Sequence, residues 1–322
     1  MYLIIIRDLV KQYQNLTAVD NLSLDICNNE VFGLLGQNGA GKTTIIHMLA
    51  TLLKPTSGSA TVNGFDIVKE PAKVRASIGI VFQAPSSDDM LTGYENLKLH
   101  SLLYNVPRKI REKRISDVLE LVDLTERQHD QVKKYSGGMR RRLEIARGIL
   151  HKPKILFLDE PTLGLDPRSR ESMWNYIRKL VQEEKITIIL TTHYMEEADF
   201  LCDRIGILDR GKIIALDTPS QLKEIVSGND IIKLRLEKKD EDFDSLLKDL
   251  SFIHRISTDV DGSVILLVEN ASRNLPKILK KVNAESVEFS NRNLNDVFIH
   301  FTAQETKEQP EGGFMEKFAQ YD

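Results

Sequence analysis

The stretch from Gly36 to Thr43 carries the pattern G-x-x-x-x-G-K-T, in which two glycines frame a turn that ends in a lysine and a threonine. Glycines let a backbone bend until several N–H groups point at one anion, and a following helix adds its positive end. Lys42 would then reach the β- and γ-phosphates of a nucleotide, and the Thr43 hydroxyl would bind Mg²⁺. A strand predicted at Val31–Leu35 and a helix predicted at Thr43–Leu53 favour a phosphate-binding loop over a plain glycine-rich turn.

Two adjacent carboxylates end another predicted strand. The apolar run Ile155–Leu158 leads directly into Asp159 and Glu160. The end of a parallel strand is where α/β proteins place ligand groups, so Asp159 would hold Mg²⁺ and Glu160 would accept a proton from an attacking water. Two acids at a solvated strand end are an equally good interpretation of this pair alone. The phosphate-binding loop upstream favours the catalytic interpretation.

Two further polar residues follow predicted strands. His193 comes after the strand Ile186–Thr191, and Gln83 comes after the strand Ser77–Phe82. His193 would hydrogen-bond the γ-phosphate and orient the water and Glu160, whereas Gln83 would reach the Mg²⁺ or the water. A single histidine after a strand is more often structural, so both assignments depend on the order of the features along the chain.

A second anion site is predicted at Ser136-Gly137-Gly138, which opens a helix over Met139–Leu150. Serine is a good N-cap, and the glycines leave the first N–H groups of the helix accessible. Without context, a plain helix start explains these residues as well. The arginines at positions 140–142 are expected to form solvated helix surface or an interface.

The whole order of these features resembles the ATP-binding subunits of ABC transporters, over roughly residues 2–222. Tyr13 lies where the adenine-stacking aromatic sits in that family. It is followed by Walker A at Gly36–Thr43, the Q-loop at Gln83, the signature at Ser136–Met139, Walker B at Asp159 with Glu160, the D-loop at Leu163–Asp166 and the switch His193. Two residues depart from the family pattern, since Tyr135 replaces leucine and Met139 stands where glutamine is common.

The resemblance implies an ATP hydrolase that uses ATP and Mg²⁺. It implies that Glu160, His193 and Gln83 are catalytic and that Thr43, Gln83 and Asp159 hold the metal. The implied nucleotide-binding residues are Tyr13, Gly36, Gln37, Asn38, Gly39, Ala40, Gly41, Lys42, Thr43, Thr44, Ser136, Gly137, Gly138 and Asp166. Because a signature cannot easily fold back onto its own P-loop, a homodimer or heterodimer of ATPase domains would enclose two ATP molecules.

Alternating strands and helices predict an α/β fold with a mostly parallel sheet, and the resemblance implies a P-loop NTPase of the ABC ATPase type over residues 1–222. The fold expected is a RecA-like core with an antiparallel β subdomain and a helical subdomain at about 84–150. The order βαββαβ over residues 223–303 predicts a small α+β ferredoxin-like domain. Residues 304–322 are rich in Glu, Lys, Gly and Gln and are expected to be a disordered tail.

Composition narrows the function further. The net charge of −3 gives no basic field for nucleic acid, so no nucleic-acid partner is expected. Cys27 and Cys202 are too few for a disulfide framework, which favours a reducing compartment. There is no apolar run of about 20 residues and no signal-peptide pattern, so we expect a cytoplasmic protein. The resemblance implies that it is peripheral at the cytoplasmic face of the membrane.

The partner is suggested by two segments. The residues Asn293–His300 resemble the ending of the daunorubicin-resistance-type ATPases, which serve separate ABC-2-type membrane permease subunits, and this implies export of a hydrophobic drug, lipid or polysaccharide. The segment Ala84–Tyr104 resembles the family region that receives the coupling helices of the membrane subunit.

A soluble ABC ATPase acting on ribosomes or nucleic acid is the alternative, but the chain has one P-loop and only about ninety residues between Walker A and signature. A P-loop kinase is disfavoured by the signature and the D-loop.

Overall fold

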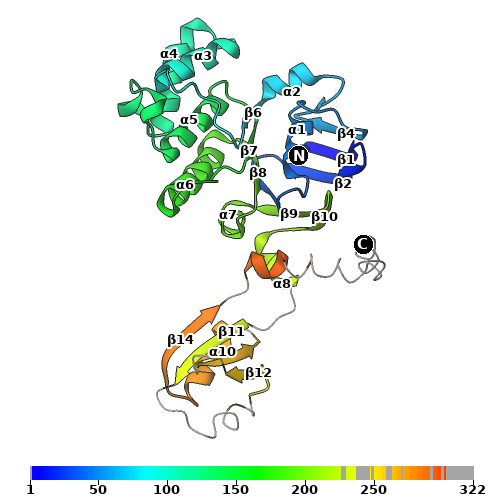
Figure 1. Cartoon of the computed structure of the whole chain (residues 1–322), viewed down its shortest axis with the longest axis vertical. Helices are drawn as coiled ribbons and strands as arrows, with labels where there is room; N and C mark the ends of the chain where they lie inside the picture. Colours follow the sequence, from blue (N-terminus) through cyan, green and yellow to red (C-terminus); the bar gives the residue numbers. More distant parts are fainter. Residues whose placement is uncertain are drawn as a thin grey trace, which may run out of the picture. The chain divides into compact units, whose positions relative to one another are not determined.

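The computed structural model describes residues 2–225, 230–236, 247, 250–258, 263–269, 271–290, 293–298 and 301. Contacts within the chain divide it into two units, Met1–Pro219 and Ser220–Asp322 (Figure 1). Each unit has a sheet and a hydrophobic core of its own. Within the part that is described, no helix combines the length and the apolar character that crossing a bilayer requires.

The centre of the first unit is a six-stranded sheet. Its strand order is β10 (Lys212–Asp217), β9 (Arg204–Asp209), β3 (Val31–Leu35), β8 (Thr187–Thr192), β7 (Ile155–Asp159) and β6 (Ile78–Val81). The strands from β9 to β6 are parallel, and β10 pairs with β9 antiparallel. Every residue of β3, β7 and β8 is buried, which is why these strands are continuous apolar runs in the sequence.

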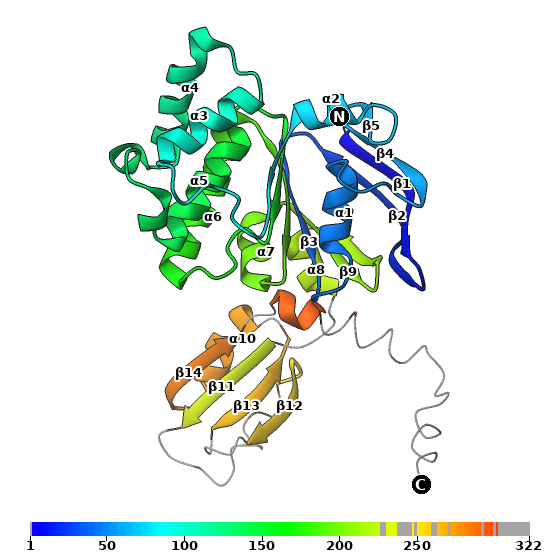
Figure 2. The ribbon, with the colours of Figure 1, turned by 45° about the horizontal axis from the view of Figure 1, so that its top comes forward.

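A second, antiparallel sheet has the order β2 (Leu16–Cys27), β1 (Tyr2–Tyr13), β4 (Ser57–Val62) and β5 (Phe65–Asp66). Helix α1 (Lys42–Leu49) lies between the two sheets (Figure 2). Ile4 and Ile6 of β1, Ile45 of α1 and Phe157 of β7 belong to one buried cluster. The helix that follows the phosphate loop is therefore packed on both sides, and this fixes the loop in place.

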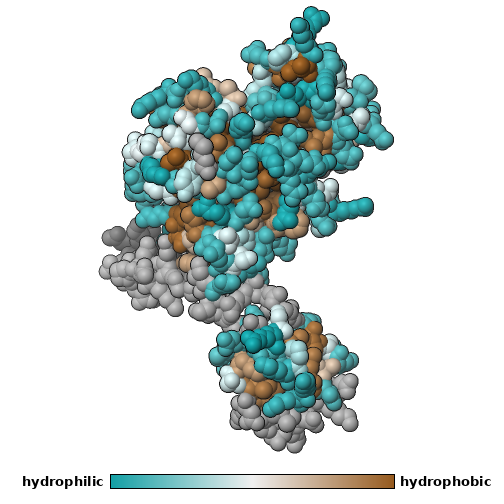
Figure 3. Space-filling view, turned by 180° about the vertical axis from the view of Figure 1, so that it is seen from behind, coloured by the Kyte–Doolittle hydropathy of each residue, from teal (hydrophilic) through white to brown (hydrophobic). Residues whose placement is uncertain are grey.

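The helical part of the first unit covers the other face of the six-stranded sheet (Figure 2). In the helical subdomain expected at about 84–150, the first helical segment divides into two helices, because Asn105 takes a positive φ of 52° and Pro107 follows it. Besides α1, this unit has the helices α2 (Pro71–Ser77), α3 (Gly93–Leu103), α4 (Arg108–Leu121), α5 (Gly137–Ile149), α6 (Pro167–Glu184) and α7 (Met195–Leu201). Short 3₁₀ turns lie at Thr125–Arg127 and Val132–Lys134. Hydrophilic residues predominate on the face of this unit drawn in Figure 3, with apolar residues between them.

The second unit has an antiparallel sheet. Its order is β12 (Ile253–Thr258), β13 (Val264–Val268), β11 (Asp230–Leu236) and β14 (Ala284–Ser290), so the last strand pairs with the first. Helix α8 (Pro219–Ile225) precedes the sheet, and α10 (Ala271–Leu279) contributes Ile278 to the core, where it joins Ile232, Leu234 and Leu266. This pairing of strands is the ferredoxin-like arrangement. Between β11 and β12, where the expected order βαββαβ has a helix, only Leu247 and residues 250–252 are described, and the tail 304–322 lies outside the described residues.

Candidate functional site

Most of the expected site residues line one cavity of about 420 Å³ in the first unit. They come from the hairpin of β1 and β2, the phosphate loop and α1, the segment after β6, and the ends of β7 and β8. The cavity wall includes Tyr13, Asn38, Gly39, Gly41, Lys42, Thr43, Thr44, Gln83, Glu160 and His193. The residues that follow β3, β6, β7 and β8 are brought together because these parallel strands end at the same edge of the sheet, and Tyr13 joins them from the hairpin of β1 and β2.

Two glycines of the loop sit where a side chain has no room. A Cβ on Gly36 would lie 2.5 Å from the Leu208 carbonyl oxygen, and a Cβ on Gly41 would lie 2.4 Å from that of Ala18. Gly41 also has a φ of 107°, which favours glycine. It precedes α1 without capping it by a side chain, so the first N–H groups of the helix are left to bind an anion.

Lys42 is buried at the base of the cavity, with 6% of it exposed. Its Nζ donates to the carbonyl oxygens of Gly36, at 2.7 Å, and Gln37, at 3.0 Å. The Glu160 Oε1 atom lies 3.7 Å from the same nitrogen. Burial lowers the pKa of Lys42, and the nearby carboxylates of Glu160 and Asp159 oppose this change. The ammonium group is already surrounded by oxygen atoms, which is the environment that phosphate oxygens would also supply.

Asp159 lies beside Thr43 with oxygen atoms suited to a hard cation. The Thr43 hydroxyl is 3.2 Å from both carboxylate oxygens, and the Thr191 hydroxyl donates to Oδ1 at 2.6 Å. Among the described residues, the His, Cys, Asp and Glu side chains form no group of three or more that would hold a metal by themselves. Mg²⁺ in nucleotide sites takes only one or two ligands from the protein and the others from phosphate oxygens and water. Thr43 and Asp159 are therefore enough protein ligands for it.

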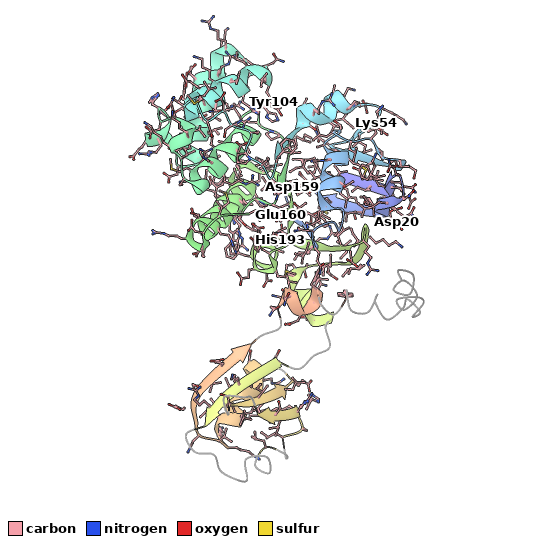
Figure 4. All side chains as sticks on the ribbon, in the orientation of Figure 1. Asp20, Lys54, Tyr104, Asp159, Glu160 and His193 are labelled. Carbon is pink, nitrogen blue, oxygen red and sulfur yellow. The ribbon has the colours of Figure 1, made fainter. Side chains whose placement is uncertain are left out.

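Glu160 is held in an unusual backbone conformation, with a φ of 49°. Its N–H lies within hydrogen-bonding distance of both the hydroxyl and the carbonyl of Thr191, at 3.1 and 3.2 Å. Its side chain accepts a hydrogen bond of 2.8 Å at Oε2 from His193 Nδ1. Figure 4 shows Asp159, Glu160 and His193 near one another in the middle of the first unit. A left-handed backbone at a non-glycine residue persists only where surrounding contacts enforce it, and such residues cluster at functional sites.

The other expected anion site lies apart from the cavity wall in this chain. Ser136 caps α5, with its hydroxyl accepting from the Met139 N–H at 3.3 Å. Gly137 faces the loop before α6 and Gly138 faces the first turn of α6, because added Cβ atoms would lie 3.6 Å from Leu165 and 3.3 Å from Ser169 respectively. Asp166 caps α6 by accepting from the Ser169 N–H at 3.0 Å. None of Ser136, Gly137, Gly138 and Asp166 is part of the cavity wall.

Tyr135 anchors the start of α5. It is 6% exposed, and its hydroxyl donates to the Arg127 carbonyl at 2.8 Å. The same hydroxyl occupies the space where Gly93 would carry a Cβ. The tyrosine that departs from the family pattern therefore joins α5 to the start of α3.

The expectation of a solvated arginine run is wrong for Arg141. Arg140 pairs with Asp89 and Arg142 pairs with Asp123 near the surface, but Arg141 is only 8% exposed. It lies four residues before Ile145, which is also buried, so the helical period would have indicated the inward face. Its guanidinium donates only to main-chain carbonyl oxygens, and those carbonyls adjoin Gln83 and Glu160.

Comparison with known proteins gives the family. A family model described as ABC transporter matches residues 19–163. The linearmycin resistance ATP-binding protein LnrL of Bacillus subtilis is 36% identical over 92% of this chain and 97% of its own length. The chain belongs to the ATP-binding proteins of ABC transporters. The daunorubicin/doxorubicin resistance ATP-binding protein DrrA of Streptomyces peucetius is 46% identical over 71% of this chain and 68% of its own length.

Solved structures agree with this family. The cbiO1 subunit of the cbiONQ ABC transporter complex from Clostridium perfringens matches with a TM-score of 0.65 and 29% identity, over 69% of this chain and 90% of that one. A dimeric ATP-binding cassette in a post-hydrolysis state, bound to ADP and phosphate, matches with a TM-score of 0.61 and 27% identity, over 67% of this chain and 98% of that one. This ABC ATPase therefore has the α/β P-loop fold expected from its sequence, and it is an ATP-hydrolysing subunit of a transporter.

Proposed function

We propose that this ABC ATPase powers export of a hydrophobic drug, lipid or polysaccharide through a separate ABC-2-type membrane permease, and that the cavity around Lys42 is its ATP site. The observation that carries the proposal is the convergence of Lys42, Thr43, Glu160 and His193 on that one cavity. Each supplies a group that phosphoryl transfer to water requires.

ATP binds with its phosphates over the start of α1. The N–H groups of residues 36–44 and the Lys42 ammonium hold the β- and γ-phosphates. Tyr13 lies in the cavity wall with 44% of its surface exposed, and Lys11 Nζ sits 5.1 Å from the ring centre. This ring gives adenine a stacking surface.

Hydrolysis uses the carboxylate of Glu160 as the general base. A water attacks the γ-phosphorus, the bond to the β-phosphate oxygen breaks, and the water proton passes to Glu160. His193 holds Glu160 by the hydrogen bond at Oε2 and orients the water and the γ-phosphate. Mg²⁺, when held by Thr43, Asp159 and Gln83, would neutralise charge on the phosphate oxygens.

A second ATPase domain completes each site. Ser136, Gly137, Gly138 and Asp166 lie outside the cavity wall of their own chain, so we assign them to the ATP of a partner subunit. The N-terminus of α5 then faces the γ-phosphate across a homodimer or heterodimer interface. The dimeric relative bound to ADP and phosphate supports this arrangement.

The membrane permease docks on the helical part, in our proposal on the segment Ala84–Tyr104. Exposed apolar side chains gather there at Met90, Leu99, Leu102 and Leu103. Such residues favour a protein interface over a purely solvated face. The relatives named for resistance to linearmycin and to daunorubicin support a hydrophobic drug as cargo, and the subunit would be peripheral at the cytoplasmic face of the membrane.

We assign residues 1–222 to the nucleotide-binding domain, with a helical subdomain at about 84–150. Residues 223–303 form the small domain, whose proposed role is to stabilise or regulate the ATPase dimer. That assignment rests on the two separate cores, since the cavity belongs to the first unit alone.

The substitution Glu160→Gln tests the proposal. It keeps the size of the side chain and removes the base, so ATP should convert the purified variant into a stable dimer with turnover reduced by about 100-fold or more. Dimer formation is measured by light scattering after size-exclusion chromatography, and turnover by phosphate release. The matched control is Glu196→Gln, an exposed acid on α7. Turnover at the wild-type rate in Glu160→Gln would contradict the assignment.

A further inference from the structure

Arg141 on α5 connects this helix to the residues that follow β6 and to the residues that follow β7. Arg141 of α5 donates from Nη1 to the Phe82 carbonyl at 2.6 Å and from Nε to the Pro161 carbonyl at 2.7 Å. Its Nη2 donates to the carbonyls of Asp159, at 2.9 Å, and Glu160, at 3.1 Å. Phe82 directly precedes Gln83, so one guanidinium holds the ends of both β6 and β7.

The chemistry of the guanidinium explains why only this side chain suits the position. Its planar fork carries five N–H groups in fixed directions, and here they meet four carbonyl oxygens from two strands. Burying a charge is costly unless its donors are satisfied, and Arg141 is 8% exposed. These bonds therefore hold the two strand ends at a fixed separation.

Glu160 is the residue most affected by this arrangement. Its N–H is held by Thr191 and its carbonyl by Arg141, so its peptide groups are fixed on both sides of a left-handed backbone. The direction of the Glu160 carboxylate follows from that backbone. Without the bond from Arg141, the residue would be free to relax to an ordinary conformation.

The same arginine lies on the helix that Ser136 caps, five residues later. A helix advances about 1.5 Å per residue, so little more than one rigid turn separates the two. Any shift of the N-terminus of α5 is therefore passed to Arg141 and to the carbonyls of Asp159 and Glu160.

We infer that Arg141 is a positioning residue that sets the backbone of Glu160 and Gln83 according to the position of α5. It touches no nucleotide and acts through the carbonyls it binds. The inference rests on the proposed role of Glu160 as the base. It gives the signature helix a direct connection, inside one chain, to the base that takes the proton of the water attacking the ATP of that chain.

The test compares Arg141→Met and Arg141→Lys with Arg142→Met, a neighbour on α5 whose partner Asp123 is at the surface. Both variants at 141 should lower kcat by about 30-fold or more while the Kd for ATP changes by less than about 3-fold, because Lys42 and Tyr13 are untouched. Lysine keeps the charge but lacks the planar fork of N–H groups that reaches the carbonyls of both strands. It should therefore not restore turnover. Arg142→Met should retain the wild-type kcat.

The outcomes separate this inference from the proposed function. Loss of turnover in Glu160→Gln together with wild-type kcat in either Arg141 variant overturns the inference alone. Turnover retained in Glu160→Gln overturns the function on which it rests. A parallel loss of ATP affinity and thermal stability in both Arg141 variants also overturns the inference, since it would show a role in holding the fold. Should Arg141→Met fail to fold, Arg141→Lys decides by the same criteria.

Discussion

His193 Nδ1 and Glu160 Oε2 are joined by a hydrogen bond of 2.8 Å that connects the ends of β8 and β7. The two residues are 33 positions apart, and their meeting depends on the parallel pairing of those strands. The bond fixes the carboxylate, and both residues line the cavity.

Removing this imidazole should affect turnover more than binding. We expect His193→Ala to lower kcat by about 100-fold, because the base and the attacking water lose their orientation. The Kd for ATP should change little, because Lys42 and the phosphate loop remain. Phosphate release and equilibrium nucleotide binding measure the two effects. His129→Ala, at an exposed position, is the control, and equal losses in both variants would contradict the role given to His193.

The aromatic ring at Tyr13 should determine affinity for the nucleotide base. Stacking of a base on an aromatic ring contributes about 1–3 kcal/mol, so Tyr13→Ala should weaken ATP binding by about 10-fold. Tyr13→Phe keeps the ring and should bind ATP as the wild type does. The control is Tyr2→Ala, an exposed tyrosine of the same strand. Titration with a fluorescent ATP analogue distinguishes the three, and weak binding by Tyr13→Phe would point to the hydroxyl instead.

The buried hydroxyl of Tyr135 should contribute measurably to stability. Its hydrogen bond to the Arg127 carbonyl is lost in Tyr135→Phe, and the loss of one intramolecular hydrogen bond costs about 1 kcal/mol of unfolding free energy. Tyr94→Phe loses a surface bond to Glu112 and should cost close to nothing. Urea unfolding of both variants tests the difference. Equal stabilities would mean that the Tyr135 bond is replaced by water.

Acid should weaken the contact between α3 and the end of α5 through His100. Burial, with Arg147 and His151 nearby, lowers the pKa of His100 from 6.5 to about 4. The unfolded chain then binds a proton that the folded chain does not, so stability falls as pH drops from 6.5 toward about 4. The ring of His100 lies 4.9 Å from that of Tyr104, which stacks on His151 at 3.9 Å.

His100→Phe keeps an aromatic ring and removes the titration. Its Tm should therefore decline less than that of the wild type over this pH range, while the two proteins behave alike above pH 6.5. Differential scanning fluorimetry at a series of pH values measures this difference. His129→Phe is the control, because His129 is exposed. A constant difference in Tm across the range would rule out His100 as the source.

Much of the cavity was predictable because its residues follow short apolar runs. Val31–Leu35 leads into the glycine of the phosphate loop, and Ile155–Leu158 and Ile186–Thr191 each lead into a polar residue. All three become central parallel strands within a residue of those bounds. A buried parallel strand has to be apolar on both faces, so its limits are visible in the sequence. The strands Ser57–Val62, Phe65–Asp66, Arg204–Asp209 and Lys212–Asp217 were not among those predicted.

The helical period places Arg141 on the inward face of α5, but its hydrogen-bond partners could not be predicted from the sequence. Three consecutive arginines by themselves favour a solvated helix face. What buries the middle one is a set of carbonyls on β6 and β7, and their direction is fixed only when the strands pair. The same holds for the left-handed backbone of Glu160, since the bonds that maintain it come from Thr191 and from Arg141.

The bonds of Lys42 to Gly36 and Gln37 have a consequence for selectivity among anions. An incoming phosphate has to replace these two carbonyl oxygens as the hydrogen-bond acceptors of the Lys42 ammonium. The net affinity for the anion is therefore the free energy of its new contacts minus that of the two lost hydrogen bonds. A lone inorganic phosphate gains little from such an exchange. A nucleotide that also engages the helix N-terminus and an aromatic ring gains enough, and the pocket thereby discriminates against the simple anions that surround it in a cell.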